Sequence, residues 1–157
     1  MERLQFLVTG GTGIFGKALL RHYLSQDFDA SSEIVVISRN PDLFFASYPE
    51  FSGHASITFL QGDIQQRDSL PWGHSFTHVL HAATDSTIGP SLTPLQRYDQ
   101  IVDGTRNILD LAVATGARRF LITSSGANYG PQPTDLAAIP EDWLGSPPLA
   151  QPSTAYG

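Results

Sequence analysis

The sequence contains no cysteine, and this absence excludes disulfide bonds, thiolate catalysis and cysteine-ligated zinc sites. It also lacks any apolar run near the roughly 20 residues that a membrane-spanning helix needs, so no membrane contact is expected. The first residues lead directly into LQFLV at positions 4–8, which has strand character. Because neither a basic leader nor a small-residue cleavage site is present, a cytoplasmic location is expected.

Positive charge is scarce as well. Nine lysine and arginine residues stand against 15 aspartate and glutamate residues, which gives a net charge of −6, and Lys17 is the only lysine. A surface that binds the phosphates of a nucleic acid carries an excess of positive charge, so nucleic-acid binding is not expected. The 157 residues, 41% of them hydrophobic, suffice for one domain with its own core, and small molecules are the expected partners.

Short apolar runs alternate with longer stretches of helical character, an order typical of βαβ units around a parallel sheet. Strands are predicted at 3–9, 33–38, 57–61, 77–81 and 119–123. Helices are predicted at 14–25, 41–47, 65–70 and 95–115, the last of them ending before Gly116. The pattern predicts an α/β fold, a doubly wound parallel sheet of the Rossmann type with strand order 3-2-1-4-5. Six of the 11 prolines lie beyond residue 130, which predicts a loop there.

A glycine-rich turn, TGGTGIFG at positions 9–16, joins the first predicted strand to the first predicted helix. Glycines at such a junction permit a sharp turn and a close approach of backbone N–H groups to a pyrophosphate, while the helix N-terminus favours the anion. The residues expected to contact a dinucleotide here are Gly10, Gly13, Ile14, Phe15 and Gly16. The alternative is a tight turn that binds no ligand.

The end of the second strand indicates which dinucleotide is bound. An acidic residue that accepts hydrogen bonds from the ribose hydroxyls of NAD is typical there, but this sequence has Ser38 and Arg39. An arginine at this point can bind a 2′-phosphate, so the sequence favours NADP, with NAD possible. The alternative is that Arg39 is a solvated residue at a strand end.

Two more elements follow in order: HAAT at positions 81–84 and SSGANYG at positions 124–130. Together with the T-G-x-x-G-x-x-G form of the glycine turn, they resemble the H-x-A-A and S-S-x-x-x-Y-G elements of the extended short-chain dehydrogenases/reductases. Over nearly its whole length the chain is similar to the NAD(P)-dependent nucleotide-sugar epimerases and dehydratases of that group. The resemblance implies a dinucleotide-binding domain at 1–130 and, at 131–157, a proline-rich active-site loop that leads to a catalytic-tyrosine helix.

The resemblance also assigns further contacts to the cofactor. Asp63 is expected to meet the adenine amino group and Ile64 to pack on the ring, although Asp63 could instead cap a short helix. Residues expected beside the cofactor are Ala82, Ala83, Thr84 and Thr123. A metal site at His74, His78 and His81 is not expected, because side chains alternate along a strand and need not converge.

The catalytic residues implied by the resemblance are Ser125 and Tyr156. The Ser125 hydroxyl is expected to hydrogen-bond the substrate oxygen as its charge changes during hydride transfer, and simple turn chemistry is the alternative. Tyr156 is expected to be the general acid/base, or else an incidental residue near the end of the sequence. The lysine that follows this tyrosine four residues later in the family is missing, so a phenol pKa near the usual value of about 10 is expected. In addition, Ile101 stands where the family often has an amide.

The expected function is therefore that of an NAD(P)-dependent oxidoreductase-type epimerase, dehydratase or reductase acting on a nucleotide sugar. The 157-residue form is expected to be an incomplete and inactive N-terminal portion. The alternative is a non-catalytic module that binds or senses NADP, which Ile101 and the missing lysine favour. The resemblance further implies a homodimer that uses the helix at 95–115 and is weakened by the truncation.

Overall fold

The computed structural model describes residues 3–26, 32–84 and 92–148, which divide between two units. The first unit consists of residues 1–84 and 103–122, and the second of residues 85–102 and 123–157. All five strands belong to the first unit. None of the helices in the described ranges combines the length and the apolar composition that a bilayer crossing requires.

The sheet of the first unit is parallel throughout. Its strands are β1 (Gln5–Thr9), β2 (Glu33–Ser38), β3 (Ile57–Gln61), β4 (His78–His81) and β5 (Arg119–Ile122). They lie in the order β3-β2-β1-β4-β5, which confirms the predicted topology. β1 pairs with β2 on one side and with β4 on the other, so Leu7 lies between Val35 and Val79. The chain therefore winds in both directions from β1, and the carboxyl ends of β1 and β4 are neighbours at the switch point, where such sheets bind ligands.

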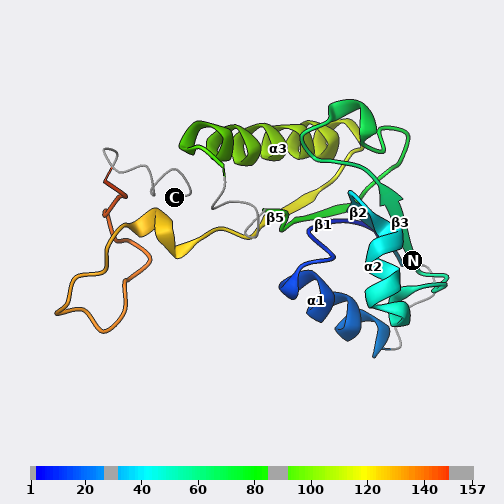
Figure 1. The fold of residues 1–157 in the computed structure, drawn as a ribbon, viewed down its shortest axis with the longest axis horizontal. Coiled ribbons are helices and arrows are strands. Elements are labelled where there is room, and N and C mark those ends of the chain that lie inside the picture. Colours follow the sequence, from blue (N-terminus) through cyan, green and yellow to red (C-terminus); the bar gives the residue numbers. More distant parts are fainter. Residues whose placement is uncertain (1–2, 27–31, 85–91, 149–157) are drawn as a thin grey trace. The chain divides into compact units, whose positions relative to one another are not determined.

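Each face of the sheet has its own core, because successive strand residues point to opposite faces. α1 (Ile14–Leu24) and α2 (Pro41–Ser47) lie on one side of the sheet, and α3 (Pro94–Ala114) lies on the other (Figure 1). The core beneath α3 contains Leu7, Val35, Ile37, Leu70, Phe76, Val79, Ile108, Leu111 and Ala112. The core beneath α1 and α2 contains Val8, Leu20, Ile34, Val36, Phe44, Phe51 and Ile57. Burial of both faces explains why β1 and β2 are apolar runs without polar alternation.

Two helix boundaries follow from local chemistry that the sequence displays. At the start of α2, Asn40 Oδ1 accepts a hydrogen bond from the Leu43 N–H at 3.0 Å, and Pro41 occupies the first helical position. After α3, Gly116 adopts a left-handed conformation with φ of +80°, and the Ala117 N–H donates to the Ala112 carbonyl at 2.9 Å. The predicted helix at 41–47 and the predicted stop at Gly116 are both confirmed.

The helix predicted at 65–70 is wrong. Only a 3₁₀ turn, η2 (Arg67–Ser69), forms there. The Ser69 hydroxyl accepts from the Asp63 N–H at 2.9 Å and lies 2.7 Å from the Gln66 carbonyl, to which it donates. These side-chain bonds close the segment into a tight turn, and Pro71 follows soon after, so a second helical turn cannot form.

β5 is an edge strand and is less covered than the other strands. Leu121 and Ile122 are 63% and 48% exposed. On the side of the sheet that carries α1, an open apolar hollow of about 750 Å³ extends over β1, β4 and β5. Its lining includes Phe6, Val8, Leu19, Leu80 and Leu121.

In the second unit, the chain after β5 forms one short 3₁₀ helix, η4 (Gly126–Tyr129). Residues 131–148 contain no helix or strand, so the predicted loop is confirmed over this stretch. Residues 149–157, with Tyr156 among them, lie outside the described residues.

Replacing Gly116 by alanine should destabilise the fold by about 1 kcal/mol. No atom lies within 4 Å of the added methyl group, so the loss of stability comes from the left-handed backbone, which alanine adopts less readily than glycine. Part of this loss is offset because alanine lowers the entropy of the unfolded chain. Gly73→Ala is the matched control, because Gly73 has the same open surroundings without the left-handed φ. Urea unfolding should place Gly116→Ala below the wild type and Gly73→Ala close to it. Equal stability of the two variants would contradict the assigned role of Gly116.

Candidate functional site

The glycine turn between β1 and α1 is pressed against the end of β4. Gly10 has φ of +74°, and a Cβ atom placed on it would lie 2.5 Å from the carbonyl carbon of Ala82 and 2.8 Å from the nitrogen of Ala83. The Gly13 N–H donates to the Gly10 carbonyl at 3.0 Å and closes the turn. Only glycine fits at position 10, because both the backbone conformation and the close approach of Ala82 exclude a side chain.

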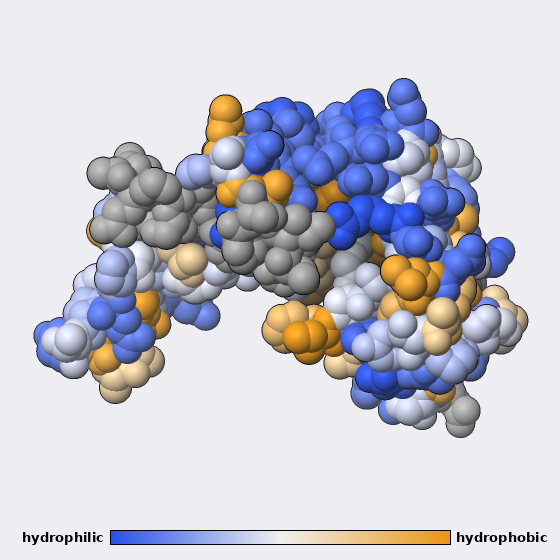
Figure 2. All heavy atoms as spheres, viewed as in Figure 1, coloured by the Kyte–Doolittle hydropathy of each residue, from blue (hydrophilic) through white to orange (hydrophobic). Residues whose placement is uncertain are grey.

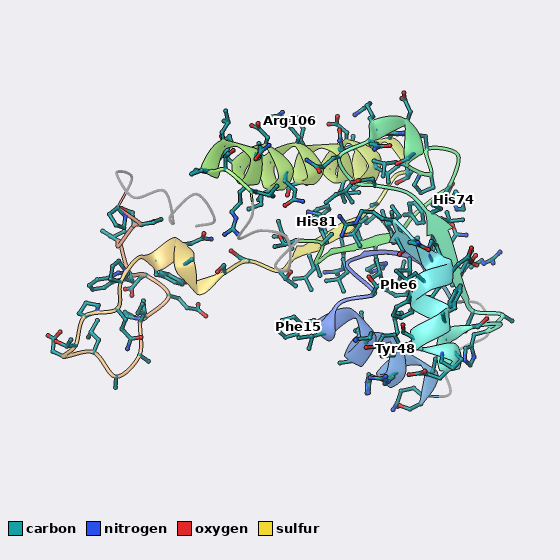
Figure 3. The ribbon with its side chains drawn as sticks, viewed as in Figure 1. Phe6, Phe15, Tyr48, His74, His81 and Arg106 are labelled. Carbon is teal, nitrogen blue, oxygen red and sulfur yellow. The ribbon has the colours of Figure 1, made fainter. Side chains whose placement is uncertain are left out.

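The start of α1 is suited to an anion. Its N-cap is Gly13, which offers no side-chain acceptor to the first turn, and that turn holds no acidic residue. Gly16 is buried, and a Cβ there would meet the Gly10 oxygen and the Gly11 backbone, so the helix packs directly on the turn. Ile14 and Phe15 are 83% and 80% exposed, and the hydrophobic spheres at this end of α1 in Figure 2 lie where Figure 3 labels Phe15. The N–H groups and the helix dipole here together favour a phosphate.

Lys17, the only lysine, contacts Tyr48, the residue that follows α2. Its Nζ donates to the Tyr48 hydroxyl at 2.7 Å and lies 4.0 Å from the centre of the Tyr48 ring. The Arg21 guanidinium lies over the neighbouring Phe51 ring at 5.4 Å. These contacts tie α1 to the segment after α2 and hold the helix start in place.

The carboxyl end of β2 carries no carboxylate. Ser38 is buried, its carbonyl accepting from the Gly62 N–H at 3.0 Å, and Arg39 is exposed. The Arg39 carbonyl accepts from Gln61 Nε2 at 3.3 Å, which fixes the backbone at this strand end. The Asn40 side chain is used as the α2 cap. Positions 38–40 thus present one cation beside the glycine turn and no acidic acceptor.

Asp63 and Ile64 follow β3 and have structural partners in the described chain. Asp63 Oδ1 accepts from the Gln65 N–H at 3.0 Å in a local turn, but the helix cap considered as an alternative is not formed, because η2 begins after Gln66 and has no side-chain cap. The half-buried Ile64 side chain lies against Gly104 of α3, where a Cβ would be 2.7 Å from Ile64 Cδ1. Asn107 Nδ2 donates to the Ile64 carbonyl at 2.8 Å. α3 therefore holds this turn in position, and contact of either residue with adenine stays a prediction.

His81 is the buried polar residue at the centre of the sheet's carboxyl edge, between the sheet and α3 (Figure 3). Its Nδ1 lies 2.7 Å from Thr9 Oγ1 on β1, and its Nε2 lies 3.1 Å from Thr105 Oγ1 on α3. Burial lowers the pKa of His81 to about 4, so the ring is neutral at pH 7. Sequence reasoning missed Thr9 and Thr105. A threonine ending one strand next to a strand ending in histidine is the signal that could have suggested the first.

The other two histidines considered for a metal site have different partners. His74 stacks on Phe76 with ring centres 5.4 Å apart, and His78 packs on Phe6 at 5.0 Å. Within the described residues, no three histidine, aspartate or glutamate side chains are arranged to hold a metal ion.

In the second unit, Ser125 caps the 3₁₀ helix η4. Its Oγ accepts from the Ala127 N–H at 3.1 Å, and the neighbouring Ser124 Oγ accepts from Asn128 Nδ2 at 2.7 Å. A hydroxyl that accepts in this way still has its own hydrogen to donate. Thr123 is exposed in this unit, and Thr84 is exposed at the end of a described range in the first unit.

The predicted cofactor contacts of the first unit gather at one edge of the sheet. The glycine turn follows β1, Ser38 ends β2 and Arg39 follows it, and Ala82 and Ala83 follow β4. These three strands are neighbours. The model of the NAD dependent epimerase/dehydratase family matches residues 6–157. The chain belongs to this family.

Several known proteins are similar to this chain. The chain is 33% identical to a UDP-glucose 4-epimerase of Streptomyces lividans over 131 residues, covering 80% of this chain and 37% of the relative. It is 31% identical to the mouse 3β-hydroxysteroid dehydrogenase type 7, covering 82% of this chain and 34% of the relative. The UDP-Glc/GlcNAc 4-epimerase structure from Campylobacter jejuni shares the fold with a TM-score of 0.75 at 22% identity, covering 92% of this chain and 43% of that one. The chain thus spans well under half the length of these relatives.

Replacing Gly16 by alanine should weaken NAD⁺ binding by about tenfold or more, because the methyl group would push α1 away from the turn. Gly73→Ala makes the same chemical change in open surroundings and should leave binding unchanged. Isothermal titration of NAD⁺ into each folded variant measures the effect. Wild-type affinity in Gly16→Ala would show that the close packing of α1 on the turn has no part in binding.

Proposed function

We propose that the carboxyl edge of the sheet binds a nicotinamide adenine dinucleotide, with its pyrophosphate at the start of α1. The observation that carries this proposal is the glycine turn, in which the Ala82–Ala83 backbone lies against Gly10 and the turn itself lies against Gly16. A side chain at either position would collide with this backbone and distort the turn that is proposed to hold the pyrophosphate. Membership of the NAD-dependent family supports the same assignment.

Within this site, we propose that Arg39 lies beside the adenosine ribose and favours NADP over NAD. A guanidinium pairs with a 2′-phosphate, and the absence of a carboxylate at positions 38–40 removes the usual acceptor for a free 2′-hydroxyl. Asp63 and Ile64 are proposed to meet the adenine, and Ala82, Ala83, Thr84 and Thr123 to line the rest of the cofactor. The half-buried position of Ile64 leaves part of its surface for such a contact.

We further propose that the whole protein is an oxidoreductase-type epimerase, dehydratase or reductase. A bound nicotinamide would supply a hydride acceptor. The Ser125 hydroxyl would donate its hydrogen to the substrate oxygen, since its lone pair already accepts from the Ala127 N–H. Tyr156 is proposed as the residue that exchanges a proton with that oxygen.

A nucleotide sugar is the proposed substrate class. The name of the Streptomyces relative supports a UDP-sugar, whereas the mouse relative is named for a steroid. Because the two identities are close, at 33% and 31%, they do not separate the substrates. The family's description as epimerases and dehydratases favours the sugar.

Replacing Arg39 by alanine should weaken NADP⁺ binding by about tenfold or more and leave NAD⁺ binding nearly unchanged, because a charged hydrogen bond to the 2′-phosphate is lost. Arg106→Ala, which removes an exposed arginine paired with Asp103 on α3, is the control. Parallel titrations with both oxidised cofactors measure the preference. Tighter binding of NAD⁺ than of NADP⁺ by the wild type would overturn the NADP assignment, and binding of neither would overturn the site itself.

In the whole protein, Ser125→Ala should lower the turnover of UDP-glucose by about 10²–10³-fold, because one donor to a developing oxyanion is lost. Ser124→Ala removes the neighbouring hydroxyl, which accepts from Asn128, and should lower turnover far less. Both changes should cost little stability because each affects a local bond near η4. Equal turnover in the two variants would remove Ser125 from the mechanism.

A further inference from the structure

His81 joins three elements that border the proposed cofactor site. It is the last residue of β4, it pairs in register with Thr9 at the end of β1, and its ring reaches Thr105 of α3. The two ring nitrogens lie 2.7 Å and 3.1 Å from the two threonine hydroxyl oxygens. The imidazole therefore bridges the carboxyl ends of β1 and β4 to the helix that covers them.

The surroundings of the ring contain no charged side chain in the contacts of the described residues. Thr9 faces the ring from β1, and Thr105 faces it from α3. The Phe120 ring on β5 lies with its centre 6.3 Å from the centre of the His81 ring. Burial is the one cause of its lowered pKa, so no neighbouring ion sets its charge. A neutral imidazole has one nitrogen that donates and one that accepts.

The ring proton has two possible places, Nδ1 and Nε2, because both face a hydroxyl that can donate or accept. Thr9 Oγ1 accepts from the Ala83 N–H at 3.3 Å, and in one of the two arrangements its own hydrogen is donated to Nδ1 of His81. Nε2 then carries the ring proton and donates to Thr105 Oγ1. The opposite tautomer would reverse both bonds, with Nδ1 donating to Thr9 Oγ1 and the Thr105 hydroxyl donating to Nε2.

Thr9 in turn determines where the chain leaves β4. Its carbonyl accepts from the Ala82 N–H at 3.1 Å, and its hydroxyl accepts from the Ala83 N–H. The same two residues are those that pack against Gly10, at 2.5 Å and 2.8 Å from a Cβ placed there. A shift of the Thr9 hydroxyl would move the Ala82–Ala83 backbone, which lies against the glycine turn.

We propose that His81 is a positioning residue for the dinucleotide site: in its Nε2–H form it orients the Thr9 hydroxyl, which holds Ala82 and Ala83 against Gly10. This role rests on the proposed cofactor function. His81 does not touch the cofactor, and it acts through Thr9.

Two substitutions separate positioning from simple packing. His81→Asn can place its Oδ1 near the Nδ1 position and keep an acceptor for the Thr9 hydroxyl, although it leaves space in the core. His81→Leu fills the volume better but has no acceptor. NAD⁺ affinity should fall about tenfold in His81→Leu and by no more than about threefold in His81→Asn, whichever variant melts lower. Thr9→Val should weaken binding like His81→Leu, and the double variant should be no weaker than either single one.

Long-range ¹H–¹⁵N correlation spectra give a reading that needs no cofactor: His81 should show a protonated Nε2 and an unprotonated Nδ1 at pH 7. The opposite tautomer would overturn the proposal. So would NAD⁺ binding by His81→Asn that is as weak as binding by His81→Leu, or normal NAD⁺ binding by folded His81→Leu, each of which would leave the cofactor site itself standing. A wild-type chain that binds neither NAD⁺ nor NADP⁺ would overturn the proposed function and this role together.

Discussion

The contact of two backbones where β1 and β4 end is the constraint on which the rest of the first unit depends. Ala82 and Ala83 approach Gly10 so closely that no side chain fits between them. The approach is possible because β1 and β4 are neighbours at the point where the strand order reverses. Gly16 makes a similar approach from the helix side, so the turn is enclosed by backbone on two sides, and its remaining surface is the one proposed to receive an anion.

Much of this arrangement could be predicted from the sequence, because it depends on local chemistry. The glycine turn, the Asn40 cap and the stop at Gly116 each follow from residues close together in the chain, and the strand order follows from the alternation of strands and helices that is typical of this fold. The failed helix at 65–70 shows the limit of such reasoning. The apolar pattern there was weak, and the Ser69 hydroxyl satisfied backbone groups that a helix would have used.

The polar network around His81 could not be predicted, because its members are far apart in sequence. Thr9 and His81 are separated by 72 positions, and His81 and Thr105 by 24. The motif identified His81 as part of an element without indicating what its ring contacts. Likewise, the sequence suggested Ser125 as a catalytic hydroxyl and turn chemistry as its alternative. The hydrogen bond to the Ala127 N–H shows that one oxygen can serve the turn and still have a hydrogen to donate.

The central claim is that the carboxyl edge of the sheet binds a dinucleotide at the glycine turn. The most direct test follows the NMR chemical shifts of assigned backbone amides during a titration with NAD⁺ and NADP⁺. The account predicts saturable shifts for amides in residues 10–16 and for Ala82 and Ala83. The amides of Gln5 and Arg118, which bond to Thr77 at the opposite edge of the sheet, should stay unchanged. Shifts confined to that opposite edge, or no shifts with either cofactor, would contradict it.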